Sequence, residues 1–330
     1  MAAFLDRHGL DGAAPAPLAG DASFRRYWRV AARGGSAVLM DAPPDKEDTG
    51  RFVAVASYLR SAGYSAPAVL AMDRARGFLL LEDLGDEKLS RLAGAARVGN
   101  GHYELAVDLL ADLHGRAPPP DTPPYDEALL AAEASLFVEW YLPAIDAAPA
   151  PAARAAFDDV WREALAPYAD VREVLVLLDY HADNLMWLEH RDGLARLGLL
   201  DFQDAVAGHP AYDLVSLLED ARLDVDGGLA AAMFARYVAA TDRDPADFGA
   251  AYATLGAQRN TKIIGIFSRL ALRDGKPGYL AMIPRVWRHL ERDLAHPALA
   301  RLRAWYGRHV PAARRAPEMP PARMDERQRR

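Results

Sequence analysis

Three polar residues with the functional groups for phosphoryl transfer stand in the middle of the chain: Asp179, Asn184 and Asp201. An aspartate can accept a proton from a hydroxyl nucleophile. An amide oxygen and a second carboxylate are hard oxygen ligands of the kind that Mg²⁺ prefers when it also binds nucleotide phosphates. A base, two metal ligands and a nucleotide together match the requirements of phosphoryl transfer.

Short apolar runs must position these side chains. Residues 174–178 end directly before Asp179, and Leu199-Leu200 ends directly before Asp201. Both runs are typical of short buried strands, so we expect them to deliver the three polar residues to one edge. The alternative is that Asp and Asn are turn residues that hydrogen-bond to their own backbone. Because all three follow this pattern together, we favour a shared site.

The composition indicates an ordinary globular protein, with 51% hydrophobic and 26% charged residues. A formal net charge of −7 argues against bulk affinity for nucleic acid, because that requires a basic face. The lack of cysteine excludes disulfides, thiolate zinc sites and cysteine nucleophiles. The first residues are charged where a signal peptide is apolar, and no run approaches the about 18 apolar residues of a membrane span. We expect a cytoplasmic enzyme with small-molecule ligands and no nucleic-acid or membrane partner.

The order of elements predicts an α+β fold, since strand signals dominate the first quarter and helical spacing dominates the remainder. We place a lobe boundary after Leu84, where a strong buried strand ends in a bend that could act as a hinge. Residues 1–84 would form the nucleotide-binding lobe and residues 85–312 the catalytic lobe. Residues 313–330 have almost no apolar side chains and are expected to be disordered. Helices are expected near 52–59, 101–113, 129–142, 152–168, 208–218, 228–241, 248–272, 279–292 and 302–306.

A second group of candidates lies in the first lobe. The turn Gly20-Asp21-Ala22-Ser23 could donate backbone N–H groups to phosphates, although with one glycine an ordinary hairpin turn is equally compatible with it. Arg25 and Arg26 follow the turn, and the arginine donor fork suits a phosphate. The exposed backbone of Leu81, Glu82, Asp83 and Leu84 could pair with an adenine.

Candidates for acceptor binding are spread over the second lobe and are weaker. Trp140 and Tyr141 could stack on a sugar ring, although core packing is the simpler interpretation. Arg259, Lys262 and Arg269 share one helix face and could bind a substrate carboxylate, whereas the simpler alternative is a solvated basic face. The remaining acceptor candidates are His181 and Asp204.

The pattern Asp179-x4-Asn184 followed by Asp201-Phe202-Gln203 resembles the aminoglycoside phosphotransferase and choline kinase superfamily, relatives of the protein kinases. Within it, the chain is most similar to bacterial anomeric sugar kinases that phosphorylate N-acetylmuramate and N-acetylglucosamine at C1 during cell-wall recycling. The closer similarity is carried by the segments at 20–27, 39–44, 81–86, 201–205, 212–218, 265–269 and 273–279.

The resemblance implies a two-lobed protein-kinase-like fold, with a small antiparallel sheet in the first lobe and a mainly helical second lobe. It implies ATP and Mg²⁺ as cofactors. It assigns Asp179 as general base, Asn184 and Asp201 as metal ligands, and Asp213 as a brace of the catalytic loop from a helix start. It also makes residues 81–84 the adenine hinge.

Two positions depart from the superfamily pattern. Leu177 stands where the catalytic loop usually has a histidine, and Met40 stands where the phosphate-binding lysine is expected. Lys46, Arg25 or Arg26 could replace that lysine, and we rank the arginines first because their strand leads directly from the turn.

Two other functions stay open. One is a kinase of the same superfamily that acts on an amino alcohol, an aminoglycoside or homoserine, which would need an acidic acceptor pocket. The other is a catalytically silent nucleotide-binding module, which Leu177 and Met40 would motivate and the retained trio argues against.

Overall fold

The structure is a computed structural model that describes residues 1–10, 14–18, 24–32, 34–94 and 99–315. The chain forms two compact units, each built from two segments. The first unit comprises residues 1–106 and 182–205, and the second comprises residues 107–181 and 206–330. The predicted turn at residues 20–23 and most of the predicted tail, residues 316–330, lie outside the described residues.

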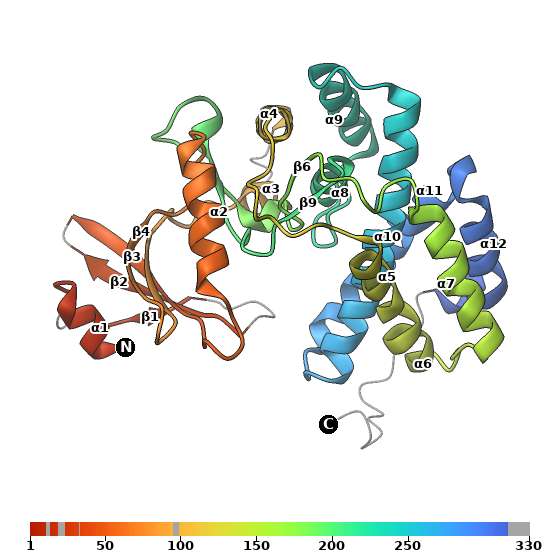
Figure 1. The fold of residues 1–330 in the computed structure, drawn as a ribbon, viewed down its shortest axis with the longest axis horizontal. Coiled ribbons are helices and arrows are strands. Elements are labelled where there is room, and N and C mark those ends of the chain that lie inside the picture. Colours follow the sequence, from red (N-terminus) through yellow and green to blue (C-terminus); the bar gives the residue numbers. More distant parts are fainter. Residues whose placement is uncertain (11–13, 19–23, 33, 95–98, 316–330) are drawn as a thin grey trace. The chain divides into compact units, whose positions relative to one another are not determined.

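The first unit contains an antiparallel five-stranded sheet in the order β1-β2-β3-β5-β4 (Figure 1). Its strands are β1 (Ala16–Pro17), β2 (Arg26–Ala32), β3 (Gly35–Asp41), β4 (Val69–Asp73) and β5 (Phe78–Glu82). Strand β5 matches the strong buried strand predicted before the boundary at Leu84, and β2 and β3 match the strand signals of the first quarter of the chain. Strand β4 was not predicted, because its Leu70 and Met72 are exposed at the sheet edge and give no buried pattern.

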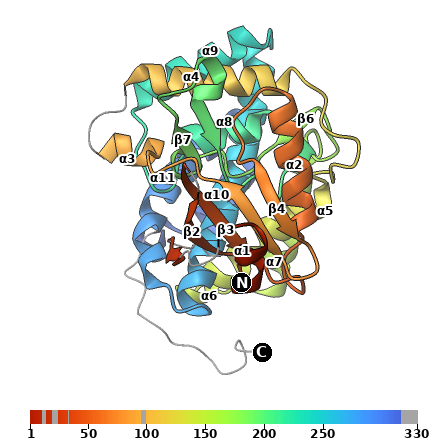
Figure 2. The same cartoon turned by 90° about the vertical axis from the view of Figure 1, so that its left-hand side faces the viewer.

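Helices cover both faces of this sheet, and the alternation of side chains explains how. Val30, Leu39 and Leu80 pack against the short helix α1 (Ala2–Arg7), which inserts Phe4 and Leu5. Met40, the neighbour of Leu39, is also buried, because successive residues of a strand point to opposite faces. Helix α2 (Thr49–Ser61) lies on the side of the sheet opposite α1 (Figures 1 and 2).

A small hairpin of β7 (Leu185–Trp187) and β8 (Leu197–Leu199) completes the first unit, with α3 (Leu89–Gly94) beside it. Backbone hydrogen bonds attach this hairpin to preceding segments: the Leu199 N–H donates to Ser65 O at 2.8 Å, and the Trp187 N–H donates to Glu87 O at 2.6 Å. Residues 182–205 therefore belong structurally with the first hundred residues.

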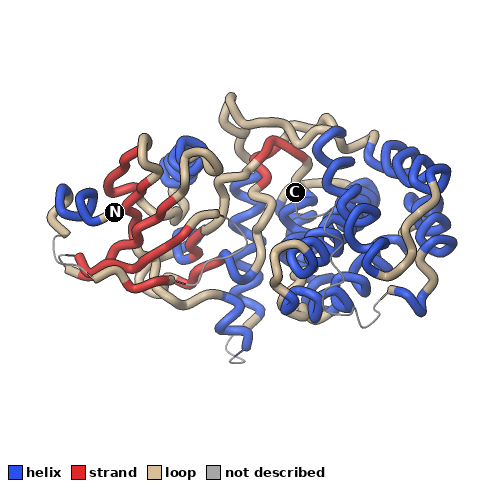
Figure 3. Tube along the Cα trace, turned by 90° about the horizontal axis from the view of Figure 1, so that it is seen from below, coloured by secondary structure: helices blue, strands red, loops and turns tan. Residues whose placement is uncertain are grey.

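The described part of the second unit is mainly helical and also contains the strand pair β6 (Val174–Val176) and β9 (Val206–Gly208) (Figure 3). The long helix α10 (Pro245–Leu272) runs through it and buries most of its side chains. Helix α4 (Asn100–His114) carries the chain from the first unit into the second. The other helices are α5 (Glu127–Leu136), α6 (Leu142–Ala144), α7 (Pro151–Leu165), α8 (Ala211–Leu218), α9 (Gly227–Ala240), α11 (Ile283–Leu294) and α12 (Ala300–His309).

Aspartate side chains define where several of these helices begin. Asp226 accepts hydrogen bonds from the N–H groups of Gly228 and Leu229 at the start of α9, and Asp244 caps α10 in the same way. Such caps satisfy N–H groups that have no partner within the helix. The predicted helix at 129–142 is divided: α5 continues as a π-helical turn, Phe137–Tyr141, before α6.

Close packing accompanies this π-helical turn. A Cβ atom on Gly265 of α10 would lie 2.4 Å from the Leu136 carbonyl carbon, so only glycine allows the two backbones to approach there.

Antiparallel strands in the first unit and helices in the second confirm the predicted α+β fold class. Among the described residues, no helix combines the length and the apolar character that crossing a membrane requires.

Candidate active site

In the first unit, Asn184 and Asp201 flank the same end of the β7–β8 hairpin. Asn184 directly precedes β7, and Asp201 follows β8 by two residues. The register pairs Leu185 with Leu199, and the Leu200 N–H donates to the backbone oxygen of Asn184 at 3.0 Å. An antiparallel hairpin thus brings an amide and a carboxylate to one end, as the strand pattern predicted for this pair.

The Asp201 carboxylate is held by two side-chain donors. Arg25 Nη2 donates to Asp201 Oδ1 at 2.9 Å, and Gln203 Nε2 donates to the same oxygen at 3.0 Å. Arg25 also contacts Glu47 at 3.4 Å, and only 8% of its side chain is exposed. A buried guanidinium therefore links the start of β2 to the candidate metal ligand.

The backbone at Asp201 is fixed by an aromatic contact. Asp201 has φ of +57°, a left-handed conformation that aspartate adopts more readily than bulky residues. The next residue, Phe202, is buried and stacks on Phe52 of α2 with ring centroids 5.1 Å apart. Such a pair contributes about 0.5–1.5 kcal/mol beyond area burial. The Phe202 anchor thus helps to hold Asp201 in its turn.

The three candidates for a phosphate-binding cation occupy different environments. Arg25 is buried beside Asp201, whereas Arg26 is 66% exposed and pairs with Asp41 at 2.7 Å. Lys46 is about half exposed and lies 3.8 Å from Asp45. The Met40 side chain is enclosed in the sheet. Among the described residues, Arg25 is the one of these side chains that contacts a candidate metal ligand, Asp201.

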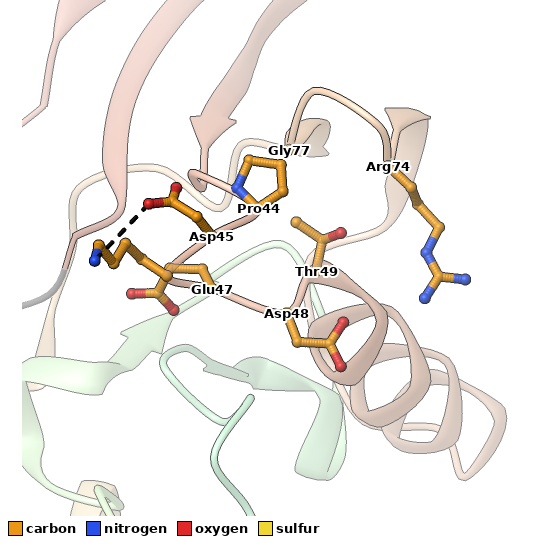
Figure 4. A pocket seen from close by; sticks show the side chains of 8 residues that line it. Pro44, Asp45, Glu47, Asp48, Thr49, Arg74 and Gly77 are labelled. Atoms are coloured by element: carbon orange, nitrogen blue, oxygen red, sulfur yellow. Dashed lines mark ion pairs between the residues drawn. The ribbon is translucent and has the colours of Figure 1, made fainter.

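Lys46 lines a cavity of about 420 Å³ whose wall is rich in carboxylates (Figure 4). The cavity is also lined by Asp45, Glu47 and Asp48, and Arg74 lies across it from Asp45. Three carboxylates beside two cations do not favour an anionic phosphate, so this cavity offers no replacement for the missing lysine.

The hinge segment carries two well-satisfied carboxylates. Glu82 binds Arg60 and Arg191, and its own N–H donates to Ala68 O at 2.8 Å. Asp83 accepts hydrogen bonds from Arg29 at 2.6 Å and from Ser36 at 2.6 Å. Burial alone would raise the pKa of Asp83, but these hydrogen bonds outweigh burial and lower it. Both side chains therefore stabilise the end of β5, and ligand pairing by the hinge backbone stays a prediction.

In the second unit, Asp179 follows a strained turn. Leu178 has φ of +68°, which is unusual for a branched side chain. The Asp213 carboxylate accepts the Leu177 N–H at 2.7 Å and the Leu178 N–H at 2.9 Å. Asp213 lies in the first turn of α8 and is fully buried. The geometry is that of a carboxylate clamped on the backbone that leads to Asp179.

His181 lies two residues after Asp179 and is buried. Its Nε2 lies 3.2 Å from Arg222 Nη1. Burial lowers the pKa of His181, and the positive charge of Arg222 lowers it further, while Asp220 and Asp179 oppose the change. His181 is therefore a neutral imidazole next to the candidate base near neutral pH.

Lys262 and Glu133 form an ion pair at 2.6 Å, with Tyr212 3.4 Å from the ammonium group. Burial would lower the pKa of Lys262, but Tyr212, Glu133 and Asp179 outweigh burial and raise it. Lys262 is therefore a cation in the electrostatic environment of Asp179. Its ammonium group neutralises the charge of Glu133.

The other acceptor candidates have distinct environments. Arg259 is buried and donates to Ser216 Oγ at 2.9 Å, whereas Arg269 is partly exposed. Tyr141 is fully buried, stacks on Phe137 and accepts a hydrogen bond from Trp287. Its ring is a core element with no open face for a sugar. The remaining two, Trp140 and Asp204, are partly exposed and exposed respectively.

The sequence did not identify His114 as a site residue. Its imidazole Nε2 lies 3.6 Å from Asp213 Oδ2, and its Nδ1 lies 2.7 Å from the Tyr237 hydroxyl. The only sequence signal is a histidine directly after the apolar stripe of α4, at a position that the 3.6-residue period turns inward.

Asn184 and Asp201 offer hard oxygen donors, which fit Mg²⁺. Within the described part of the chain, no group of three or more histidine, aspartate or glutamate side chains is arranged to hold a metal ion. Mg²⁺ usually binds through one or two carboxylates together with substrate phosphates, so a two-residue protein contribution is compatible with it.

The comparison with known proteins identifies the family. The phosphotransferase enzyme family (APH) matches residues 15–248. A protein of Caulobacter vibrioides named N-acetylmuramate/N-acetylglucosamine kinase is 41% identical over 352 aligned residues, which include 95% of this chain and 97% of the relative. A protein of the same name from Pseudomonas aeruginosa is 38% identical, over 87% of this chain and 86% of its own.

The solved structures agree with this family at the level of the fold. A choline/ethanolamine kinase family protein from Mesorhizobium loti superposes with a TM-score of 0.60 at 18% identity, over 92% of this chain and 99% of its own. Such low identity supports the fold alone. The family match and the two relatives confirm the predicted superfamily and enzyme class. The chain belongs to the phosphotransferase enzyme family and is a phosphotransferase with a protein-kinase-like fold.

Proposed function

We propose that this enzyme transfers the γ-phosphoryl group of ATP to the anomeric hydroxyl of N-acetylmuramate, N-acetylglucosamine or both. The observation that carries the proposal is the 41% identity, over nearly the whole chain, to a protein named for these two substrates. The retained trio of Asp179, Asn184 and Asp201 supports an active kinase over a silent nucleotide-binding module.

Asp179 would be the general base. The anomeric hydroxyl is more acidic than an ordinary alcohol, so the carboxylate needs to accept its proton only late in the reaction. Such assistance is typically worth about 10²- to 10⁴-fold in rate. The Asp213 clamp on Leu177 and Leu178 supports this role, because it fixes the backbone that leads to the base.

Arg25 would face the nucleotide phosphates in place of the missing lysine. Its guanidinium is buried and already bound to Asp201, so little side-chain entropy is lost when it meets an anion. Asn184 and Asp201 would hold Mg²⁺, which when bound neutralises charge on the phosphates. Residues 81–84 would pair with the adenine through their backbone.

The acceptor environment favours a sugar over a cationic substrate. An amino alcohol or an aminoglycoside needs unpaired carboxylates, yet Glu133 is paired with Lys262 at 2.6 Å. Arg259, which is buried and donates to a neutral hydroxyl, Ser216 Oγ, instead places a cationic group in the second unit that suits the carboxylate of a muramic acid.

A substrate screen tests the proposal. ADP release with ATP and Mg²⁺ is measured for N-acetylmuramate and N-acetylglucosamine, and for choline, homoserine and an aminoglycoside at the same concentrations. Turnover with either sugar at least about 100-fold above the other acceptors is the expected result. Preferential turnover of an amine-bearing acceptor would instead favour the kinase of cationic substrates, and nucleotide binding without transfer to any acceptor would favour the silent module.

A further inference from the structure

The imidazole of His114 lies in a row of buried polar groups that ends at the backbone of the catalytic loop. His114 Nδ1 lies 2.7 Å from the Tyr237 hydroxyl, and Nε2 lies 3.6 Å from Asp213 Oδ2. The side chains of His114 and Asp213 are both completely buried. Asp213 in turn accepts the N–H groups of Leu177 and Leu178. In the described structure Nε2 of His114 has no hydrogen-bond partner, and the Asp213 carboxylate lies just beyond hydrogen-bond distance from it.

The surroundings determine which ring nitrogen carries the proton. Burial raises the pKa of the Tyr237 hydroxyl, so this group stays protonated. The guanidinium of Arg243, which can only donate, interacts with the same hydroxyl. The Tyr237 hydrogen is therefore available to Nδ1 of His114. With Nδ1 as acceptor, the ring hydrogen lies on Nε2, the nitrogen that is 3.6 Å from Asp213 Oδ2.

Asp213 needs such a neighbour because its carboxylate is cut off from water. A buried carboxylate is stable only when donors compensate for the lost solvation. Its two strong donors are the N–H groups of Leu177 and Leu178, and Leu178 is held at φ of +68°. A strained residue keeps such a conformation only when its surroundings fix it. Asp213 thus holds the turn before Asp179, and any side chain that orients Asp213 would orient this turn as well.

We propose that His114 is a positioning residue for phosphoryl transfer, which acts through Asp213 on the turn that presents Asp179. The proposal rests on the proposed function insofar as Asp179 is the base. It assigns to α4, an element remote in sequence from the loop, the polar support that the apolar Leu177 cannot give. His114 contacts neither substrate nor nucleotide in this account.

The test replaces His114 with phenylalanine, which keeps the ring shape and removes both nitrogens. A second variant, His114→Gln, can still donate a hydrogen from near the Nε2 position. The matched control is His102→Phe, because His102 lies on the same helix but contacts Trp187. Two readouts are taken: kcat and KM for ATP, and deuterium uptake of the peptide 175–181 without any substrate.

We expect His114→Phe to lower kcat by about 10- to 100-fold, the range typical of a slightly misplaced catalytic group. The KM for ATP should stay within about twofold. Deuterium uptake at 177–179 should increase, His114→Gln should recover part of both changes, and the His102 control should show neither. Wild-type kcat together with wild-type deuterium uptake in His114→Phe would overturn the proposal.

Two further outcomes are decisive. If His114→Phe does not fold, Tyr237→Phe removes the hydroxyl that sets the tautomer but keeps the ring that stacks on Phe248. It should change kcat and uptake in the same direction, and wild-type values of both would reject the account. The wild-type enzyme could also prove to phosphorylate neither sugar. In that case, increased deuterium uptake at 177–179 in His114→Phe would still support the positioning role, and only the proposed substrates would be rejected.

Discussion

Arg25 and Asp201 are 176 positions apart in the chain, and the guanidinium of one donates to the carboxylate of the other at 2.9 Å. The contact joins the strand after the predicted phosphate turn to the predicted metal ligand. It supports the proposal that Arg25, which directly precedes β2, supplies the positive charge that the buried Met40 cannot give at the lysine position.

Replacement of Arg25 by methionine should therefore impair nucleotide use. The variant leaves Asp201 and Glu47 without their shared cation, and loss of one partner of a buried charge pair typically costs about 2–5 kcal/mol. We expect kcat/KM for ATP to fall about 100-fold or more, measured by steady-state kinetics. The control is Arg26→Met, which removes an exposed cation paired with Asp41 and should keep at least half of the activity. Equal effects of the two variants would rule out the special role of Arg25.

The metal ligand and the base should respond differently to the same chemical change. If Asp201 is the metal ligand, Asp201→Asn removes the negative charge on which Mg²⁺ binding depends and should abolish turnover, whereas Asp179→Asn should slow turnover by about 10²- to 10⁴-fold. Calorimetry separates the two roles, because Mg²⁺ should still strengthen ATP binding to Asp179→Asn but not to Asp201→Asn. Wild-type rates in both variants would end the assignment of this site.

Arg259 provides a test of acceptor selectivity. If its guanidinium binds the carboxylate of a muramic acid, Arg259→Ala should reduce turnover of N-acetylmuramate by about 10- to 100-fold, whereas N-acetylglucosamine, which lacks this group, should be turned over normally. Ser216→Ala is the matched control, since it removes the hydrogen-bond partner of Arg259 and keeps the charge. A loss of equal size for both sugars would identify Arg259 as a packing residue.

A buried pair of carboxyl groups predicts how stability depends on pH. Asn260 Nδ2 donates to Glu219 at 2.7 Å and to Asp293 at 2.9 Å. Burial raises the pKa of both groups, and for Asp293 the neighbouring Glu219 raises it further. The folded protein therefore keeps a proton that the unfolded chain releases near pH 4. The contribution of this pair to the free energy of unfolding is complete below that pH. It is lost as the pH rises through the raised pKa values of the folded state.

Urea unfolding of the wild type and of Asp293→Asn at a series of pH values upward from about 5 measures this loss. For one retained proton the free energy of unfolding should fall by at most about 1.4 kcal/mol per pH unit. Comparison of the two proteins removes the contribution of His289, whose pKa burial lowers to about 4 and which destabilises both of them as the pH falls below its unfolded value of about 6.5. Asp293→Asn has no proton to lose there and should show a flatter profile. An identical slope in the wild type and the variant would show that the pair does not share a retained proton.

The strands, the helices and the positions of the site residues at strand ends were predictable because they depend on patterns within short segments. The apolar runs before Asp179 and Asp201 gave the strands β6 and β8, and the 3.6-residue period gave most helices. The apolar pattern missed β4 for a clear reason, namely that its Leu70 and Met72 face outward at an edge.

Contacts between distant segments were not predictable from the same patterns. Nothing local links Arg25 to Asp201, Lys262 to Glu133 or His114 to Asp213. Each pair is brought together by packing, and a charged residue on a helix has the same sequence signature whether it is solvated or paired. The solvated basic face that was the simpler expectation for Arg259 is wrong, because this side chain is buried by α8 and α10.

Transfer of phosphate to an anomeric hydroxyl is tested most directly by a ³¹P NMR spectrum of the product. The reaction contains ATP, Mg²⁺ and N-acetylmuramate or N-acetylglucosamine, with Asp201→Asn as the blank. A glycosyl 1-phosphate signal that appears with the wild-type enzyme and not with the variant is the predicted result. A sugar phosphorylated at another hydroxyl, or no sugar phosphate with either substrate, would contradict it.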